Sequence, residues 1–182
     1  MSRKKEDLLE QAERLFYEHG FHAIGLKKVV TESGVALMTL YNHFQSKEDL
    51  IMEVLKRREA RYFSSLKACL NEAKGEPSVA LMEAHLFWTR RHGSNGCMFL
   101  RAKEEFANGN QAIVDYVDAH KEALIDFFQA AGYTNRNAIR LALLFEGTTA
   151  LAETRPLDEV AEECLFFAKQ IRLESDKKAK SE

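Results

Sequence analysis

The feature that most constrains this chain is a pair of short apolar segments joined by a glycine. They lie in residues 26–47, whose sequence is LKKVVTESGVALMTLYNHFQSK. Gly34 can take the positive φ that a tight turn between two helices requires. The pattern therefore predicts helices over about 27–33 and 37–44. Two helices joined in this way are the geometry that sets a second helix into the major groove of DNA.

The side chains of this window divide into two groups. Residues spaced to form a small core are Val30, Val35, Leu40 and Phe44. Hydroxyl, amide and imidazole groups suited to phosphates and base edges are carried by Thr39, Tyr41, Asn42 and His43. The window thus has an inward face and an outward face.

Helical spacing of apolar residues continues through the rest of the chain. With only 2 prolines and 9 glycines in 182 residues, long helices are favoured over short strands. We expect an all-α fold of about nine helices, with a three-helix N-terminal helix-turn-helix domain and a C-terminal helical bundle. The expected domains are a helix-turn-helix domain over 1–46, a ligand-binding and dimerisation domain over 47–173 and a charged tail over 174–182. The other expected helices are 4–19, 47–73, 78–91, 97–108, 111–131, 136–153 and 157–173.

Positive charge is concentrated near the N-terminus. The formal net charge is −2, yet Lys27, Lys28 and Lys47 lie within the first fifty residues, and 153–163 is acidic. What matters for DNA binding is where the positive charge lies. The chain is therefore expected to contact phosphates with one end only.

Several other classes of protein are not expected. The three cysteines form no zinc spacing with the six histidines, and no metal or cofactor is predicted. The sequence has no P-loop, dinucleotide fingerprint or metalloprotease motif, which argues against an enzyme. It also has no run of 18 apolar residues and no signal peptide, so a cytoplasmic protein without a membrane partner is expected.

The pattern G-V-x-x-x-T-L-Y-x-H-F-x-S-K-E-D-L, at residues 34–50, is long and specific. Together with Ala12, Leu15, Phe16, Gly20 and Phe21, it resembles the tetracycline-repressor (TetR) family of regulators. The resemblance implies that the helix at 37–44 binds operator DNA. It further implies phosphate contacts by Thr39, Tyr41 and Lys47, with His43 against the DNA backbone.

The chain departs from this pattern at several positions. Gly25 and Ala36 stand where the family often has capping hydroxyls, and Leu37 and Met38 replace residues that are usually polar or small. Two apolar side chains at the tip could contact thymine methyl groups. The full set of expected DNA-binding residues is Lys27, Lys28, Leu37, Met38, Thr39, Tyr41, Asn42, His43 and Lys47.

The resemblance is weaker in the C-terminal part and covers only patches, such as Gly96–Leu100 and Glu105-Phe106. It implies a homodimer with a small-molecule cavity inside the C-terminal helices. Bulky or polar side chains on the central helices are candidates for binding the unknown effector. They are Phe63, His85, Trp88, Cys97, Met98, Phe99, Glu105, Tyr116 and Phe127. The wide apolar faces of the last two helices fit either a contact with a second copy or the subunit's own core.

The predicted function is a DNA-binding transcriptional regulator, a repressor released from operator DNA by a small-molecule effector. Two alternatives remain open. Cys97 follows a glycine-rich loop and begins a helix, a place where the dipole lowers a thiol pKa, so the regulator could sense oxidants or electrophiles. Alternatively, the apolar tip at residues 36–38 fits a helical interaction protein that does not bind DNA.

Overall fold

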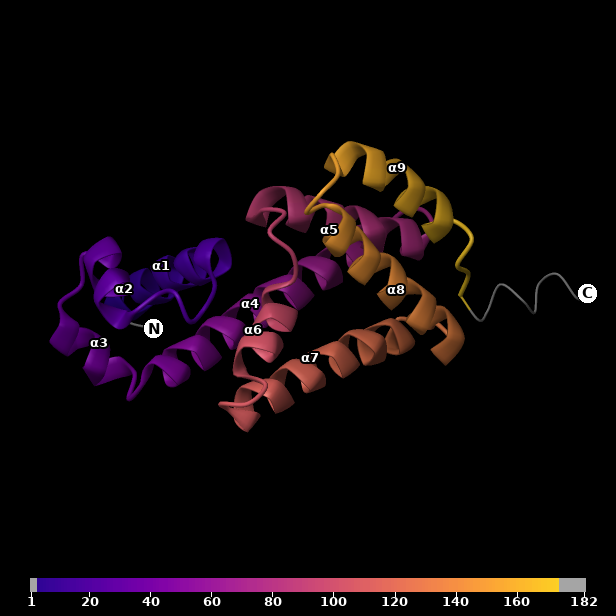
Figure 1. Ribbon diagram of the computed structural model, residues 1–182. Coiled ribbons are helices and arrows are strands. Elements are labelled where there is room, and N and C mark those ends of the chain that lie inside the picture. Colours follow the sequence, from indigo (N-terminus) through magenta and orange to yellow (C-terminus); the bar gives the residue numbers. More distant parts are fainter. Residues whose placement is uncertain (1–2, 174–182) are drawn as a thin grey trace, which may run out of the picture. The chain divides into compact units, whose positions relative to one another are not determined.

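The computed structural model describes residues 3–173, and within them every regular element is a helix (Figure 1). The expected all-α fold with nine helices is confirmed for these residues, while the tail at 174–182 lies outside them. The helices are α1 (Arg3–His19), α2 (Leu26–Ser33), α3 (Leu37–His43), α4 (Lys47–Glu72), α5 (Pro77–His92), α6 (Met98–Phe106), α7 (Gln111–Ala130), α8 (Asn135–Leu151) and α9 (Leu157–Ala168).

The described chain forms two compact units. The head unit comprises residues 3–61 and 98–117, and the body unit comprises residues 62–97 and 118–173. This division by packing passes through α4 and α7 and assigns α6 to the head unit. The expected boundary after residue 46 separates a DNA-binding domain from a ligand-binding domain by their functions rather than by their packing. That boundary stays a prediction.

In the head unit, α1 packs against α2 and α3, and α2 packs against α3. The apolar stripe of α1 causes this, because Leu8, Leu15 and Phe16 are fully or almost fully buried. Val35, Leu40 and Phe44 are buried as expected. Val30 is only half-buried, because Val29 takes the inward position on α2.

The start of α4 is capped by its own first turn. Ser46 Oγ accepts a hydrogen bond from the Asp49 backbone N–H at 3.0 Å, and the Asp49 carboxylate accepts one from the Gln45 N–H at 3.0 Å. The first bond satisfies an N–H group that a helix start otherwise leaves without a partner, and the second ties the residue before the cap to the first turn.

A buried carboxylate ties α1 to α4. Glu13 is only 6% exposed, and its two oxygens accept hydrogen bonds from Arg57 at 2.9 Å, Arg58 at 2.9 Å and Arg61 at 2.6 Å. The Arg58 guanidinium also lies over the Tyr17 ring, 4.8 Å from its centroid. We call Glu13 and these arginines the Glu13 cluster.

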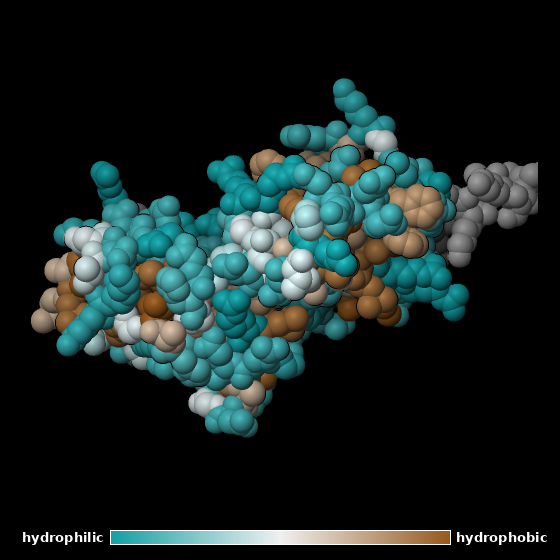
Figure 2. Space-filling model, turned by 45° about the horizontal axis from the view of Figure 1, so that its top comes forward, coloured by the Kyte–Doolittle hydropathy of each residue, from teal (hydrophilic) through white to brown (hydrophobic). Residues whose placement is uncertain are grey.

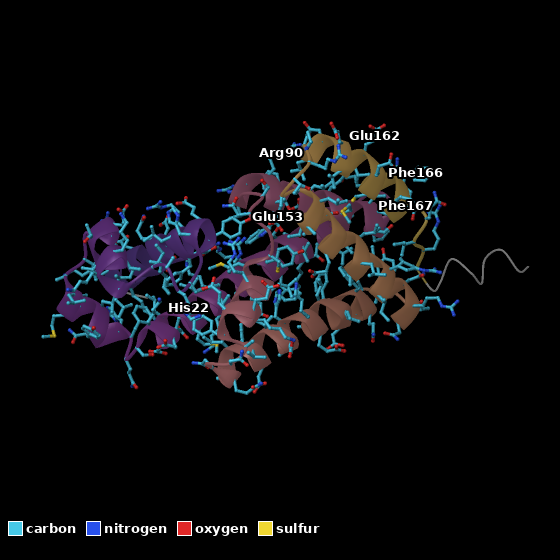
Figure 3. All side chains as sticks on the ribbon, viewed as in Figure 1. His22, Arg90, Glu153, Glu162, Phe166 and Phe167 are labelled. Atoms are coloured by element: carbon cyan, nitrogen blue, oxygen red, sulfur yellow. The ribbon has the colours of Figure 1, made fainter. Side chains whose placement is uncertain are left out.

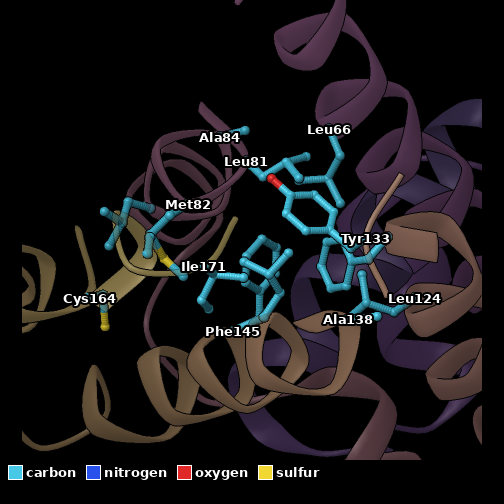
Figure 4. Close-up of a cluster of buried hydrophobic side chains, with 14 of the residues drawn as sticks. Leu66, Leu81, Met82, Ala84, Leu124, Tyr133, Ala138, Phe145, Cys164 and Ile171 are labelled. Atoms are coloured by element: carbon cyan, nitrogen blue, oxygen red, sulfur yellow. The ribbon is translucent and has the colours of Figure 1, made fainter. Parts of the chain in front are cut away.

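In the body unit, α5 packs against α8 and α9, and α8 packs against α9. One hydrophobic cluster, to which α4 and α7 also contribute, fills the interior of this unit (Figure 4). Leu81, Met82, Phe128, Leu141 and Phe145 are almost completely buried there.

The sequence-based expectation that the last helix reaches residue 173 is wrong. Helix α9 ends at Ala168, after which Gln170 and Ile171 make short turns through their N–H groups. The turn lets Ile171 join the core at 6% exposure, and Asn137 Nδ2 donates to the Arg172 carbonyl at 2.8 Å. The apolar spacing of residues 164, 168 and 171 resembled a longer helix because the chain buries Ile171 by folding inward.

Replacing Glu13 with glutamine should destabilise the protein by about 3 kcal/mol, because breaking a buried ion pair leaves uncompensated charge. Urea unfolding followed by circular dichroism measures the loss. Glu10→Gln is the matched control, since Glu10 is exposed on the same helix and surface changes cost about 0.5 kcal/mol or less. Equal midpoints for the two variants would contradict the assigned role of Glu13.

Candidate nucleic-acid interface

Helices α2 and α3 form the helix-turn-helix that the sequence predicts. Helix α2 ends at Gly34, whose φ of 65° lies in the left-handed region. Buried Val35 then fixes the chain before α3 begins. Neither Gly25 nor Ala36 provides a side-chain hydrogen bond to the helix that it precedes. Their backbone carbonyls accept the first helical bonds instead.

The outward side of α3 carries an exposed group of side chains. Met38 is 73% exposed and Tyr41 is 51% exposed, with Leu37 at 39%, while Asn42 is also exposed. The space-filling view shows apolar surface on the part of the head unit where α3 lies (Figure 2). Because Leu40 and Phe44 anchor the opposite side of α3 in the core, the outward side chains are presented by a fixed helix.

The other α3 candidates are less accessible. Thr39 and His43 are half-buried, and the His43 ring lies 6.2 Å from the Phe44 ring, centroid to centroid. They flank the outward group without belonging to its tip. Such positions suit contacts with a DNA backbone better than contacts with base edges deep in a groove.

The three candidate lysines have different surroundings. Lys27 is exposed. Lys28 Nζ lies 2.7 Å from the Glu32 carboxylate, and this pairing lowers the pKa of Glu32. Lys47 Nζ donates to the His22 carbonyl at 3.5 Å, and burial lowers the pKa of Lys47 against the opposing effect of Glu48 and Glu105. Lys27 is therefore the most available of the three for a phosphate.

The nine effector candidates do not lie together in one unit. Met98, Phe99, Glu105 and Tyr116 are in the head unit, and the other five are in the body unit. Tyr116 donates a hydrogen bond to Glu59, and burial together with that carboxylate raises the pKa of Tyr116. Glu105 accepts from the backbone N–H groups of Phe21 and His22. In this structure, Tyr116 and Glu105 therefore hold parts of the head unit together.

Three of the body-unit candidates, Phe63, Trp88 and Phe127, belong to a group of packed aromatic rings. Ring centroids lie 5.6 Å apart for Phe63 and Phe127, and 5.2 Å apart for Tyr62 and Trp88. Phe63 also lies 5.8 Å from the buried His120. Sequence reasoning did not select Tyr62 or His120, although their positions on α4 and α7 gave the same helical-face signal as their neighbours.

His85 lies at the centre of this region. Its Nδ1 accepts from the Tyr62 hydroxyl at 2.8 Å, and its Nε2 donates to the Phe145 carbonyl at 3.0 Å. Burial lowers the pKa of His85 to about 4, despite the opposing backbone hydrogen bond. The imidazole is therefore neutral at pH 7, and both of its nitrogens have partners.

Cys97 has a lysine next to it. Lys121 Nζ lies 3.3 Å from Cys97 Sγ and 2.6 Å from a Glu146 oxygen. Burial alone would lower the pKa of Lys121, but Cys97 and Glu146 outweigh it and raise that pKa. The ammonium therefore stays charged beside the half-buried sulfur.

Neither a metal centre nor a membrane segment emerges in the part of the chain that the structure covers. Across residues 3–173, no three His, Cys, Asp or Glu side chains gather as metal ligands. No helix in that range combines the length and apolar character that a membrane crossing requires.

Comparison with known sequences gives the following relatives. The HTH-type transcriptional activator FasR of Mycolicibacterium smegmatis is 33% identical over 67 residues, covering 37% of this chain and 31% of FasR. An HTH-type transcriptional regulator of Staphylococcus aureus is 26% identical over 124 residues, covering 68% of this chain and 64% of that protein. The matched part thus spans about a third of the first relative and just under two thirds of the second.

Comparison with solved structures supports the same fold. The TetR-family regulator SCO4454 of Streptomyces coelicolor superimposes with a TM-score of 0.82 at 24% identity, covering 92% of this chain and 93% of that one. Residues 8–54, which include all of α2 and α3, match the family model described as bacterial regulatory proteins, tetR family. This helix-turn-helix segment is therefore similar to that of the tetR family of bacterial regulatory proteins.

Proposed function

We propose that the protein is a cytoplasmic transcriptional regulator that binds operator DNA as a homodimer. The observation that carries the proposal is the outward face of α3, where Leu37, Met38, Tyr41 and Asn42 project from a helix anchored by buried Leu40 and Phe44. A recognition helix contacts base edges with its N-terminal residues while flanking groups contact phosphates. Its action is by binding, and no residue is assigned a catalytic role.

Each outward side chain has a chemistry that fits this role. Tyr41 and Asn42 can donate hydrogen bonds to phosphates or base edges, and Lys27 supplies positive charge. Leu37 and Met38 lack donors but fit against the C5-methyl group of thymine. The operator is therefore expected to contain A·T pairs beneath the tip of α3.

We further infer that an effector in the body unit releases the protein from DNA, and that bound protein represses transcription. Support for an effector site comes from the aromatic group around Phe63 and Trp88, which adjoins the polar groups of Tyr62 and His85. Binding sites for small molecules combine apolar walls with a few placed polar groups. One relative is named an activator, so a reporter gene under the operator is the measurement that decides the direction of control.

The dimer is inferred from an outward stripe on α8. Leu143 is 67% exposed and Leu151 is 52% exposed, with the small residues Gly147 and Ala150 between them on the same face. A Cβ added to Gly147 would meet nothing within 4 Å. Phe166 and Phe167 of α9, labelled in Figure 3, are also more than half exposed. Small residues between exposed apolar ones suit close approach of a second copy.

DNA binding is tested by fluorescence anisotropy with a site selected from random duplexes, across a salt series. The affinity should fall steeply with salt, as phosphate contacts require. Met38→Ala should weaken binding to the selected site by roughly fivefold or more, because a lost base contact costs about 1–3 kcal/mol. Phe87→Ala, which removes an exposed apolar side chain of the body unit, is the control. Affinity for every duplex no greater than that of an acidic control protein would refute the regulator proposal.

The dimer is tested by Gly147→Gln. Glutamine favours a helix over glycine by nearly 1 kcal/mol, so the substitution should not lower the folding stability of the isolated subunit. If α8 packs closely on a second copy, the new side chain should raise the dimer dissociation constant at least tenfold in analytical ultracentrifugation. Lys67→Gln on exposed α4 surface is the control. Unchanged association of the Gly147→Gln protein would exclude this stripe as the interface.

A second mode of control through Cys97 is favoured by its contact with Lys121. A charged ammonium beside the sulfur attracts the anionic form of a thiol, which is the nucleophile. Alkylation with iodoacetamide should therefore modify Cys97 ahead of the other two cysteines and weaken DNA binding. Cys97→Ser should bind DNA normally and resist the reagent, with anisotropy and mass spectrometry as readouts. Equal loss of DNA binding in both proteins would eliminate Cys97 as the sensor.

A further inference from the structure

The turn between α1 and α2, at residues 20–25, is held by a carboxylate from a distant part of the sequence. Glu105 Oε1 accepts from the Phe21 backbone N–H at 3.0 Å, and Oε2 accepts from the His22 N–H at 2.6 Å. In return, His22 Nε2 donates to the Glu105 carbonyl at 2.6 Å. We call these three hydrogen bonds the Glu105 clamp. They lie wholly within the head unit.

The turn is shaped to admit this carboxylate. Gly20 has a φ of +87°, and a Cβ added there would lie 2.8 Å from Glu105 Oε1. Next to the clamp, the Phe106 ring lies 4.8 Å from the His22 ring and 6.0 Å from the Phe21 ring. Hydrogen bonds to a charged acceptor are about twice as strong as neutral ones. The clamp is therefore a specific junction rather than a loose surface contact.

The clamped turn leads directly to DNA-binding elements. Helix α2 begins at Leu26, immediately after the turn, and packs against α3. The carbonyl of His22 accepts from Lys47 Nζ at 3.5 Å. The same turn therefore locates both the start of the helix-turn-helix and one lysine that the family resemblance assigns to phosphate contact.

We propose that Glu105 is a positioning residue for operator binding, which holds the α1–α2 turn so that α2, α3 and Lys47 lie in the DNA-binding arrangement. This inference rests on the proposed DNA-binding function. Helix α6 starts at Met98, directly after Cys97, and carries Glu105 in its last turn. Loosening the clamp from α6 would lower the affinity for DNA without altering any residue that contacts it.

The direction in which operator affinity changes when Glu105 loses its charge distinguishes a positioning role from a purely electrostatic one. Glu105 is negative, so removing its charge would by itself strengthen attraction to phosphates. Glu105→Gln keeps the size of the side chain but places an amide N–H₂ group against one of the two backbone donors. We expect its operator affinity to fall at least about fivefold, since a neutral amide oxygen is a weaker acceptor than a carboxylate and one backbone donor loses its partner.

Glu104→Gln is the matched control, because Glu104 is the exposed neighbour on the same helix and loses the same charge. Its affinity should stay equal or rise slightly. Operator affinity of Glu105→Gln equal to or above that of Glu104→Gln would overturn the inference and leave the DNA-binding function standing. If the unmodified protein bound no operator, the function would fall, and this inference with it.

Two further measurements guard against a trivial folding defect. Amide hydrogen exchange should speed up at Phe21 and His22 in Glu105→Gln but not in Glu104→Gln, while the thermal midpoint and the dimer dissociation constant stay near those of the parent. The second variant is His22→Ala, whose exposed ring makes the return bond of the clamp. Its effect on operator affinity should be non-additive with Glu105→Gln, as for residues in one network. Simple additivity, or unchanged exchange at both amides, would contradict the clamp.

Discussion

The head unit depends on one buried carboxylate. Glu13 lies on the apolar side of α1, where a charge is costly unless it is paired and hydrogen-bonded. Arg57, Arg58 and Arg61 supply that pairing from successive turns of α4, so α1 can bury its apolar stripe only in the register that brings the arginines to Glu13. Apolar packing brings the helices of the head together, and the Glu13 cluster fixes their registration.

Much of the fold follows from local patterns in the sequence. The start of α4 could be predicted because Ser46 and Asp49 make a capping pair within a single turn of the backbone. The end of α9 could not be predicted in this way. Whether the chain at Ile171 continues as a helix or turns into the core depends on contacts with Asn137 and α8. The spacing of apolar residues in α9 carries no information about these contacts.

Some residues of the candidate sites could likewise be predicted from the sequence, and others could not. The outward residues of α3 were accessible to sequence reasoning, because a short helix with Leu40 and Phe44 inward must turn Met38 and Tyr41 outward. Glu105 was predicted as an effector ligand, yet its carboxylate binds backbone groups more than 80 residues earlier in the chain. The Glu13 cluster left one trace in the sequence, an acid on an apolar face, but the partners of that acid could only be seen in three dimensions.

The close approach at Gly20 also limits how this protein can diverge. Any side chain at position 20 would meet both an unfavourable φ and the oxygen of Glu105. A side chain at position 20 would therefore displace the Glu105 carboxylate from the clamp as well as strain the backbone, so the two positions are coupled. Gly20 follows α1, whereas Glu105 lies on α6. A chimera that joins the first fifty residues of one relative to the remainder of another therefore takes these two residues from different parents. It keeps the Glu105 clamp only if the two residues are compatible.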